Sequence, residues 1–402
     1  MPDVLIVGAG VVGASVAYHL AELGCTDVVV MDRRAADAHP GSTGLAPGFV
    51  GQLSSTPELA ALAQDSVKTF STLHDSTGTA AFRRVGCLEI ATGGERLTSF
   101  HADVEQGKRL GIDARVIAPQ EAAGLAPGLV DPSQALGALY VPSDGAAEPT
   151  VVTTALVESA AARGVAFRWG TAVHELALAG GRVVGVVTDA GVVRAERVVL
   201  ATGIWGTRLT EPAGQRLPMV AVEHPYVLSP ERPELADALE PTTRPIVRYP
   251  EHAVYTRQHG RRWGLGSYAH QARPVAALAL GDSAERLYPH QDFDPVVTTA
   301  AALVPAWRGT SPERRINGVF ALTPDELPLV GTPAALPGLY LAEASWVTHS
   351  GGVGRLVAHL LTGKGEPPVD PDRLHPDRFA GWTQAEISSR ALAHYSNIYD
   401  AH

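Results

Sequence analysis

The chain has 402 residues, of which 45% are hydrophobic and 18% charged, so it can bury a large core and is expected to form two interwoven domains. A formal net charge of −10 excludes the broad basic face that a phosphate backbone requires, and we expect no nucleic-acid partner. Cys25 and Cys87 are the only cysteines, which predicts small buried side chains and neither a disulfide framework nor a metal site.

The N-terminal residues form a nucleotide-binding pattern. An apolar strand at 4–7 follows the first residues without a leader segment, which predicts a cytoplasmic protein. In the GxGxxG that follows, Gly8 permits a tight turn, Gly10 lets a pyrophosphate approach, and Gly13 lets the helix pack on the strand. Asp32 ends the next strand, where an acid can bind ribose hydroxyls. We predict a dinucleotide site, for FAD or NAD; the alternative is a glycine-rich turn in an unrelated α/β protein.

A neutral, glycine-rich segment comes next. Residues 38–57 contain no Asp, Glu, Lys or Arg. Pro40, Pro47 and Pro57 nevertheless exclude a helix that spans a membrane, because proline breaks the hydrogen bonds such a helix needs. We therefore expect a loop, and no membrane contact.

Residues 181–206 favour FAD over NAD. They are typical of β-ribbon strands that turn at 189–191, followed by a buried strand at 198–201. The strand ends at Thr202 and Gly203.

Residues 338–363 favour FAD as well. They are typical of a strand, a polar loop and a helix that begins around 351–354. Such a helix start offers free N–H groups and a positive dipole end to the flavin edge that becomes negative on reduction. The alternative is a helix start whose glycines serve packing only.

A series of ordered motifs along nearly the whole chain carries a resemblance. The motifs are GxGxxG at 8–13, GSTxxAPG at 41–48, YVPSDG at 140–145, RVVLATGIWG at 197–206, GSYAH at 266–270, FALTPDELPLVG at 320–331 and EASWVTHSGGV at 343–353. The chain resembles the dimethylglycine dehydrogenase, dimethylglycine oxidase and sarcosine dehydrogenase family of D-amino acid oxidase-like flavoproteins. The resemblance implies an α/β fold in which a Rossmann-like FAD-binding domain is interleaved with a substrate domain built on a mixed or antiparallel β-sheet.

The expected domains are discontinuous. We assign residues 1–82, 145–215 and 322–372 to the FAD-binding domain, 83–144 and 216–321 to the substrate domain, and 373–402 to a C-terminal extension packed on the FAD-binding domain. The residues expected to contact FAD are Gly8, Gly10, Val12, Gly13, Asp32, Arg33, Ser42, Thr43, Leu45, Ala46, Val173, Ala201, Thr202, Gly203, Trp205, Gly351, Gly352, Val353 and Gly354.

Leu45 departs from the family pattern. In the family, the GST loop passes beside the flavin, and this position usually carries the histidine that bonds covalently to it. Leucine has no nucleophilic nitrogen, so the resemblance implies a non-covalent FAD with an altered redox potential. The alternative is a packing change without effect on the chemistry.

The resemblance also implies the catalytic residues. His224 in EHPYV and Tyr255 in VYTRQHG correspond to the pair that faces the substrate, although a hydrogen-bonded core histidine is the alternative for His224. Arg257 lies on the same strand face as Tyr255 and is a candidate partner for a substrate carboxylate, in competition with the arginines at 248, 261 and 262. His270 is a further candidate, and His349 could place positive charge near the reduced flavin and assist reaction with O2.

The expected activity is oxidation of an N-methyl or N-substituted amino acid to an imine that water hydrolyses, with O2 or another acceptor taking the electrons. Family members commonly continue into a folate-binding domain, and this chain ends close to where that domain would begin, so a separate folate-dependent partner is expected if formaldehyde is not released. The only lysines, Lys68, Lys108 and Lys364, lie outside the segments expected to face the ring, and oxidase versus dehydrogenase stays open. Two alternatives are a non-catalytic flavin-binding subunit and an NAD-dependent dehydrogenase.

Overall fold

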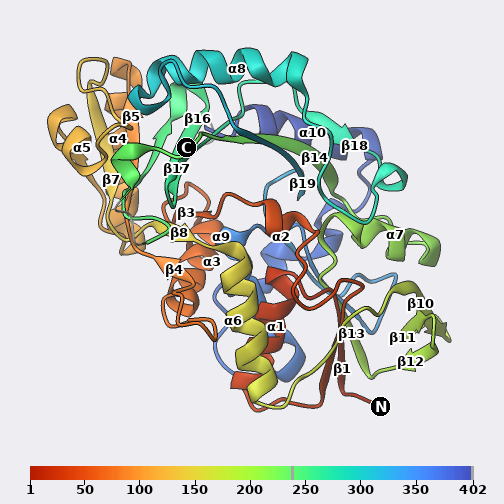
Figure 1. Ribbon diagram of the computed structural model, residues 1–402. Coiled ribbons are helices and arrows are strands. Elements are labelled where there is room, and N and C mark those ends of the chain that lie inside the picture. The colour runs from red at the N-terminus through yellow and green to blue at the C-terminus, as the bar shows by residue number, and fades with distance from the viewer. Residues whose placement is uncertain (237–239, 400–402) are drawn as a thin grey trace.

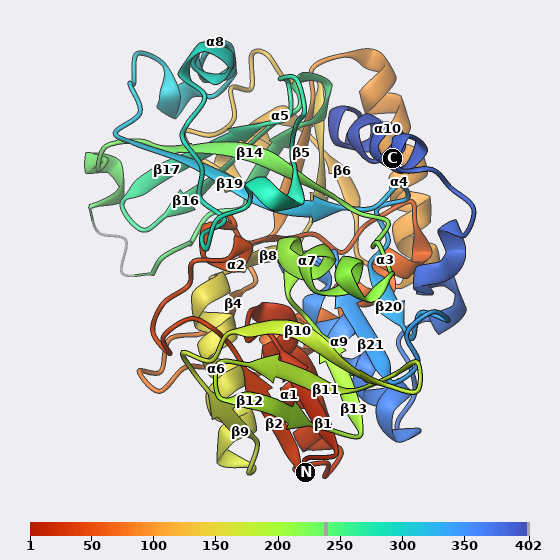
Figure 2. The same ribbon diagram turned by 90° about the vertical axis from the view of Figure 1, so that its right-hand side faces the viewer.

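The structure is a computed structural model that describes residues 1–236 and 240–399. Two large sheets define its halves: a mainly parallel sheet lies in the lower part of Figure 2 with the N-terminus, and a mainly antiparallel sheet lies above it. We call these the parallel-sheet half and the antiparallel-sheet half. Residues 237–239 of the predicted substrate domain and 400–402 of the predicted C-terminal extension lie outside the described residues.

The parallel-sheet half is built on six strands in the order β20-β21-β13-β1-β2-β9. All neighbours run parallel except β20 and β21, which pair antiparallel. The strands are β1 (Val4–Val7), β2 (Val28–Met31), β9 (Ala166–Arg168), β13 (Arg197–Leu200), β20 (Leu329–Gly331) and β21 (Leu339–Glu343). The carboxyl ends of β1, β13 and β21 meet at one edge, where open α/β sheets bind ligands.

Helices cover one face of this sheet. Val4 and Ile6 of β1 are fully buried against α1 (Val11–Glu22) and α9 (Val347–Thr362). The helices α3 (Pro57–Phe70) and α6 (Pro149–Ala162) pack beside them (Figure 1).

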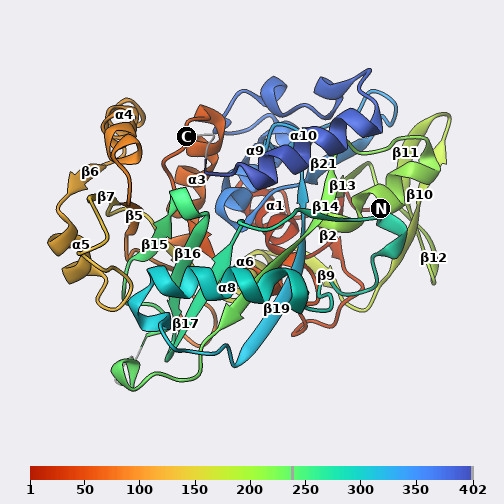
Figure 3. The ribbon, with the colours of Figure 1, turned by 90° about the horizontal axis from the view of Figure 1, so that it is seen from above.

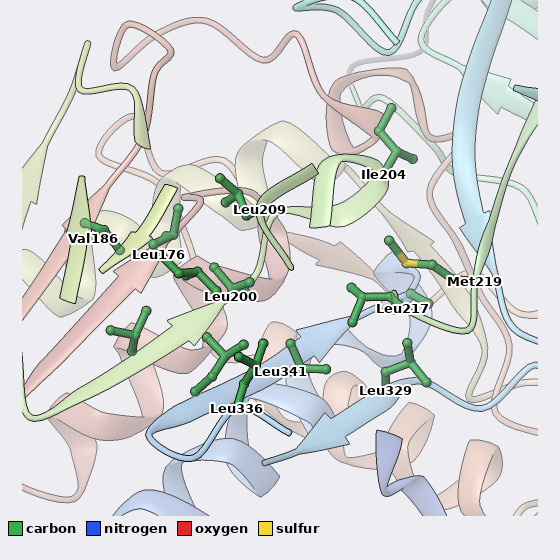
Figure 4. Close-up of a cluster of buried hydrophobic side chains, with 14 of the residues drawn as sticks. Leu176, Val186, Leu200, Ile204, Leu209, Leu217, Met219, Leu329, Leu336 and Leu341 are labelled. Atoms are coloured by element: carbon green, nitrogen blue, oxygen red, sulfur yellow. The ribbon is translucent and has the colours of Figure 1, made fainter. Parts of the chain in front are cut away.

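A three-stranded ribbon covers the other face. It consists of β10 (Val173–Ala179), β11 (Arg182–Thr188) and β12 (Gly191–Arg194). Figure 4 shows the cluster between the layers, where Leu176 and Val186 of the ribbon face Leu200 and Leu341 of the sheet. Alternate side chains of each strand thus serve opposite layers, because successive strand residues point to opposite faces.

The antiparallel-sheet half is built on nine strands, with β18-β14-β17-β16-β15-β5-β7-β6 in order and β19 paired to β14. The strands are β5 (Cys87–Ala91), β6 (Arg115–Ile117), β7 (Gly137–Val141), β14 (Val220–Leu228), β15 (Ile246–Tyr249), β16 (Val254–His259), β17 (Arg262–Ser267), β18 (Arg273–Val275) and β19 (Arg314–Leu322). The helices α4 (Gly94–Leu110), α5 (Pro119–Leu125) and α8 (His290–Leu303) lie on the outside of this half (Figure 1).

Short elements join the halves. The strands β3 (Phe49–Val50), β4 (Phe82–Arg83) and β8 (Gly145–Ala147) form a small sheet at the boundary, and α2 (Ser42–Leu45) lies between the large sheets in Figure 2. The short helix α7 (Gly206–Thr210) follows β13.

The C-terminal helix α10 (Gln384–Ser396) packs on the antiparallel sheet. Thr383 and Glu386 form a capping box at its start, and Ile387 and Tyr395 are buried against residues of β14 and β19. In Figure 3 the helix lies alongside β14. The predicted C-terminal extension thus divides between the halves: Leu374 and Phe379 pack in core clusters of the parallel-sheet half, whereas α10 buries its apolar face on the antiparallel sheet.

Within residues 1–236 and 240–399, none of the helices combines the length and the apolar character that crossing a bilayer requires.

Candidate functional site

A cavity of about 1100 Å³ lies between the two sheets. The parallel-sheet half lines it with the turn after β1, the loop after β13 and the first turn of α9, and α2 and the segment around it lie at the boundary. The antiparallel-sheet half contributes residues of β14, β15, β16 and β19, and Ile398 and Tyr399 also line it. This volume is slightly above the range of roughly 300–1,000 Å³ that is usual for ligand pockets, so the cavity can hold a large ligand.

The turn between β1 and α1 is shaped by backbone contacts. Gly8 has a φ of 99°, and a Cβ added to it would lie 2.3 Å from the Ala201 carbonyl oxygen. A Cβ on Gly13 would lie 1.9 Å from the Gly8 carbonyl oxygen. Asp32 Oδ2 accepts a hydrogen bond of 2.6 Å from the Ala9 N–H, which fixes the turn to β2. The turn therefore presents backbone, without side chains, to the cavity beside the start of α1.

The helix α2 connects this turn to the antiparallel sheet. Thr43 Oγ1 accepts from the Val11 N–H at 3.3 Å, and Ser42 Oγ donates to the Val319 carbonyl oxygen at 2.6 Å. Leu45 lines the cavity and packs against a cluster that includes Tyr255. The helix thus positions Leu45 where the two halves of the cavity meet.

The first turn of α9 closes another side of the cavity. Val347, Thr348 and His349 line it, and Thr348 Oγ1 donates to the Phe49 carbonyl oxygen at 2.9 Å. Burial lowers the pKa of His349 to about 4, so its ring is neutral near neutral pH. The positive charge that we expected at His349 is therefore not supported by this structure.

Tyr255 and His224 face the cavity from the antiparallel sheet. The Tyr255 hydroxyl and His224 Nε2 lie 2.8 Å apart, and both side chains line the cavity. Burial, with a smaller effect of His270, lowers the pKa of His224 to about 3. Burial also raises the pKa of Tyr255 well above its usual value, so both groups are neutral at neutral pH.

Charged and aromatic groups surround this pair. Arg248 is opposite Tyr255 in the register of β15 and β16, and its guanidinium pairs with Glu89 at 2.5 Å and lies 4.5 Å from the ring centre of Tyr399. Glu326 also lines the cavity; burial, and then Asp325, raise its pKa to about 7. The other aromatic residues of this region are Phe49, Tyr268, Phe320 and Trp346.

The family model described as FAD dependent oxidoreductase matches residues 3–360. The chain belongs to this family of FAD-dependent oxidoreductases. FAD is therefore the cofactor of this protein, and the alternative of an NAD-dependent dehydrogenase is overturned.

Relatives and solved structures agree with the family match. Mitochondrial dimethylglycine dehydrogenase of Rattus norvegicus is 30% identical over an alignment of 411 positions, which covers 98% of this chain and 47% of the relative. 4-Methylaminobutanoate oxidase (formaldehyde-forming) of Paenarthrobacter nicotinovorans is 29% identical over 94% of this chain and 45% of its own. The chain thus spans about half the length of these curated relatives. The crystal structure of L-proline dehydrogenase from P. horikoshii has a TM-score of 0.81 at 24% identity, covers 94% of this chain and 97% of its own, and shows the shared fold.

The cavity fits FAD on its own geometry. The side-chain-free turn at Gly8 and Gly10 and the start of α1 suit a pyrophosphate, and the first turn of α9 presents a second positive dipole end. The guanidinium carbon of Arg33 lies 4.3 Å from the ring centre of Trp205, and both residues line the cavity. The predicted residues that line the cavity are Gly8, Gly10, Val12, Asp32, Arg33, Ser42, Thr43, Leu45, Ala46, Val173, Ala201, Thr202, Gly203, Trp205, His224, Tyr255 and His349.

Five predicted flavin contacts are corrected by the structure, four of them in α9. The helix α9 begins at Val347 and not near Gly351, so Gly351, Gly352, Val353 and Gly354 lie inside it and do not line the cavity. The N–H groups of Gly351 and Gly352 face Ser66 Oγ of α3, at 3.0 and 3.2 Å. A Cβ on Gly354 would lie 2.3 Å from Ser15 Oγ of α1. These glycines serve helix packing, the alternative that the sequence had left open. Gly13 does not line the cavity either; it packs against the Gly8 carbonyl oxygen and so supports the turn.

Arg257 is also placed away from the cavity. Its guanidinium is fully buried, pairs with Glu148 and donates to the Pro47 carbonyl oxygen at 2.5 Å and to Thr242 Oγ1 at 3.1 Å. These contacts direct its donors to the segment around β3 and β8, so the expected pairing with a substrate carboxylate is not supported. Of the competing arginines, Arg248 is the one that lines the cavity.

Several cavity residues were missed by sequence reasoning. Tyr268, Glu326 and Trp346 lie in motifs that carried the resemblance, but no spacing rule distinguishes them from their neighbours. Tyr399 has no local signal at all, because only the packing of the C-terminal segment brings it to the cavity.

Proposed function

We propose that this protein catalyses the FAD-dependent oxidation of a secondary or tertiary amine, an N-methyl or N-substituted amino acid. The product imine hydrolyses to an aldehyde and the dealkylated amine. The observation that chiefly supports the proposal is the Tyr255–His224 pair, held at 2.8 Å and facing the same cavity as the glycine-rich turn. The two named relatives, which act on dimethylglycine and on 4-methylaminobutanoate by their names, support this substrate class.

FAD, when bound in this cavity, would supply the acceptor for the hydride on the carbon beside the amine nitrogen. The residues of this chain have to remove the proton of the ammonium, because the nitrogen lone pair must be free before that carbon can lose a hydride. We assign the Tyr255 hydroxyl as the donor to His224 Nε2, 2.8 Å away, which leaves the Tyr255 oxygen lone pairs free to accept an N–H from the substrate. The aromatic walls exclude water and strengthen this contact.

Arg248 is the proposed partner of the substrate carboxylate. It stands beside Tyr255 on the adjacent strand, and its contact with Glu89 uses only part of a guanidinium that has five N–H donors. A substrate held by Arg248 at its carboxylate and by Tyr255 at its nitrogen is fixed at two points.

We also propose that FAD is bound without a covalent bond. Leu45 lines the cavity at the position where relatives usually carry the bonding histidine, and its side chain offers no nucleophile. Precipitation with acid tests this: yellow supernatant over a colourless pellet is expected. A yellow pellet would show that another cavity residue, such as His39, forms the bond.

The substrate class is tested by anaerobic mixing with dimethylglycine, sarcosine, 4-methylaminobutanoate, L-proline and glycine, with flavin absorbance as the readout. We expect bleaching by an N-methylated amino acid, formaldehyde among its products, and much slower bleaching by glycine. Stoichiometric FAD that no amine bleaches would instead support a non-catalytic flavin-binding subunit.

A further inference from the structure

Four side chains form a hydrogen-bonded chain that leads away from the cavity. Tyr255 Oη lies 2.8 Å from His224 Nε2, His224 Nδ1 lies 2.8 Å from Tyr395 Oη, and Tyr395 Oη lies 2.9 Å from His270 Nε2. Tyr255 lines the cavity, whereas His270 is half-buried and lies outside the cavity lining. Strand β16, strand β14, helix α10 and the segment after β17 each supply one member.

The direction of each hydrogen bond follows from the contact of His270 at the outer end of the chain of four side chains. The Gln271 carbonyl oxygen can only accept, so His270 Nδ1, at 3.0 Å, must donate to it. In the neutral ring Nε2 is then an acceptor and receives the Tyr395 hydroxyl proton. The Tyr395 oxygen in turn receives the Nδ1 proton of His224, whose Nε2 receives the Tyr255 proton. With these protons assigned from the network, every donor points outward from the cavity.

Burial keeps the inner members neutral. The exposed fractions of His224, Tyr255 and Tyr395 are 9%, 8% and 0%. Burial lowers the pKa of His224 to about 3 and raises that of Tyr395 well above its usual value. A proton that enters this chain is therefore held by neither inner group.

The outer end is surrounded by charged groups. Burial lowers the pKa of His270, Arg273 lowers it further, and the Gln271 carbonyl, Asp292 and Glu223 act in the opposite direction. Arg273 pairs with both acids, at 3.0 Å for Glu223. His270 thus combines partial exposure with nearby carboxylates, as the receiving end of a proton path requires.

We propose that this chain of four residues carries the ammonium proton of the substrate out to His270, with Tyr395 of α10 as the connecting link. The inference rests on the proposed function. The amine N–H proton passes to Tyr255 Oη as the Tyr255 proton passes to His224 Nε2. The Nδ1 proton of His224 passes to Tyr395 Oη, and the Tyr395 proton passes to His270 Nε2. One proton has then moved from nitrogen to imidazole, and solvent receives it.

Tyr395 and His270 are positioning and relay groups, since neither touches the substrate. The Glu223 carbonyl oxygen, 3.1 Å from Tyr395 Oη, is a competing acceptor for the same hydroxyl proton. When Tyr395 donates there, the chain is interrupted, so the strength of the His270 contact sets how often the path is complete.

The first test is independent of turnover. In holoenzyme with ¹⁵N-labelled histidine, we expect NMR to show His224 protonated on Nδ1 with a free Nε2, its signals being assigned with His224→Gln. Tyr395→Phe removes the acceptor for Nδ1–H and should populate the Nε2–H tautomer. Tyr249→Phe is the matched control, because it removes a buried hydroxyl that donates to the Leu129 carbonyl oxygen at 2.7 Å outside the chain. It should leave the tautomer unchanged.

The second test measures anaerobic flavin bleaching across pH. For Tyr395→Phe we expect a rate lower by about tenfold or more, a flattened pH profile and a smaller solvent isotope effect, with wild-type behaviour for Tyr249→Phe. His270→Ala should also be slow, and added imidazole should restore its rate, because the missing group lies at the accessible end. Imidazole should not rescue Tyr395→Phe.

Two results would overturn the relay: His224 protonated on Nε2 in the wild type, or a Tyr395→Phe variant with an unchanged rate and pH profile. Failure of the proposed function looks different. In that case no amine bleaches the flavin of the wild type, while the tautomer of His224 still decides whether the directed chain exists.

Discussion

The two halves of the cavity are built by different means. In the parallel-sheet half, residues close in sequence form the turn: Gly13 packs on the Gly8 carbonyl oxygen and Asp32 accepts from the Ala9 N–H, all within one strand–helix–strand unit. In the antiparallel-sheet half, Tyr255 meets His224 only because β16 and β14 lie in the same sheet. The cofactor side can therefore be inferred from spacing, whereas the substrate side depends on tertiary packing.

The largest effect is expected at the turn. Gly13→Ala places a Cβ 1.9 Å from the Gly8 carbonyl oxygen, and backbone cannot move aside cheaply. We expect protein without flavin, or no soluble protein, measured as FAD per chain after purification. The matched control is Gly124→Ala in α5, where no atom lies within 4 Å of an added Cβ. It should keep full flavin content and change the unfolding free energy by less than about 1 kcal/mol.

Glu343 gives the parallel-sheet half a pH dependence. Its Oε1 accepts from the Thr202 N–H at 2.8 Å and from the Thr202 hydroxyl at 2.6 Å, while Oε2 is buried without a partner. Burial raises the pKa of this carboxyl to about 7. The folded state then binds the proton more tightly than the unfolded state does. The contribution of Glu343 to the unfolding free energy is therefore fully present below the usual carboxyl pKa and is lost as the pH rises toward 7.

Glu343→Gln should abolish this loss, because the amide does not ionise. Relative to wild type, we expect the variant to gain up to about 3 kcal/mol of unfolding free energy between pH 5 and pH 8, measured by denaturant titration at both pH values. Glu285→Gln, at an exposed position, is the control and should show no such difference. An identical pH dependence of Glu343→Gln and wild type would contradict the assignment.

Arg248 of β15 and Arg257 of β16 allow a comparison of a cavity residue with a structural residue within the antiparallel-sheet half. Arg248→Lys keeps the charge beside Glu89 but loses the planar fork, so KM for a carboxylate-bearing amine should rise about tenfold, with little change for an amine without a carboxylate. Arg257→Lys should leave KM unchanged and lower the melting temperature, because Arg257 holds Glu148 and Pro47. The reverse pattern would return Arg257 to the site.

Much of the fold could be predicted from the sequence because its signals are local. The strand at Val4–Val7, the glycine turn and the strand that leads to Asp32 all lie where the pattern placed them. The family match confirms the resemblance and FAD as the cofactor, and the mixed α/β fold is confirmed by the solved structures. The domain boundaries stay a prediction.

The rest could not be predicted, because packing decides it. The glycines after His349 fit a helix start as well as a helix interior that crosses other helices closely, and only the contacts of Gly351 and Gly354 distinguish the two. Strand alternation correctly places Tyr255 and Arg257 on one face, but a long side chain can reach a different neighbour from the same face. Tyr395 reaches His224 through the docking of α10, for which the sequence holds no local signal.

The most direct test of the account compares wild type with Tyr255→Phe and His224→Ala in anaerobic stopped-flow reduction, using the best N-methyl amino acid. We expect both variants to keep about one FAD per chain, since other residues build the parallel-sheet half of the cavity. We expect the rate of flavin reduction to fall about 100-fold or more. Reduction at the wild-type rate in both variants would contradict the account and remove the pair from the site.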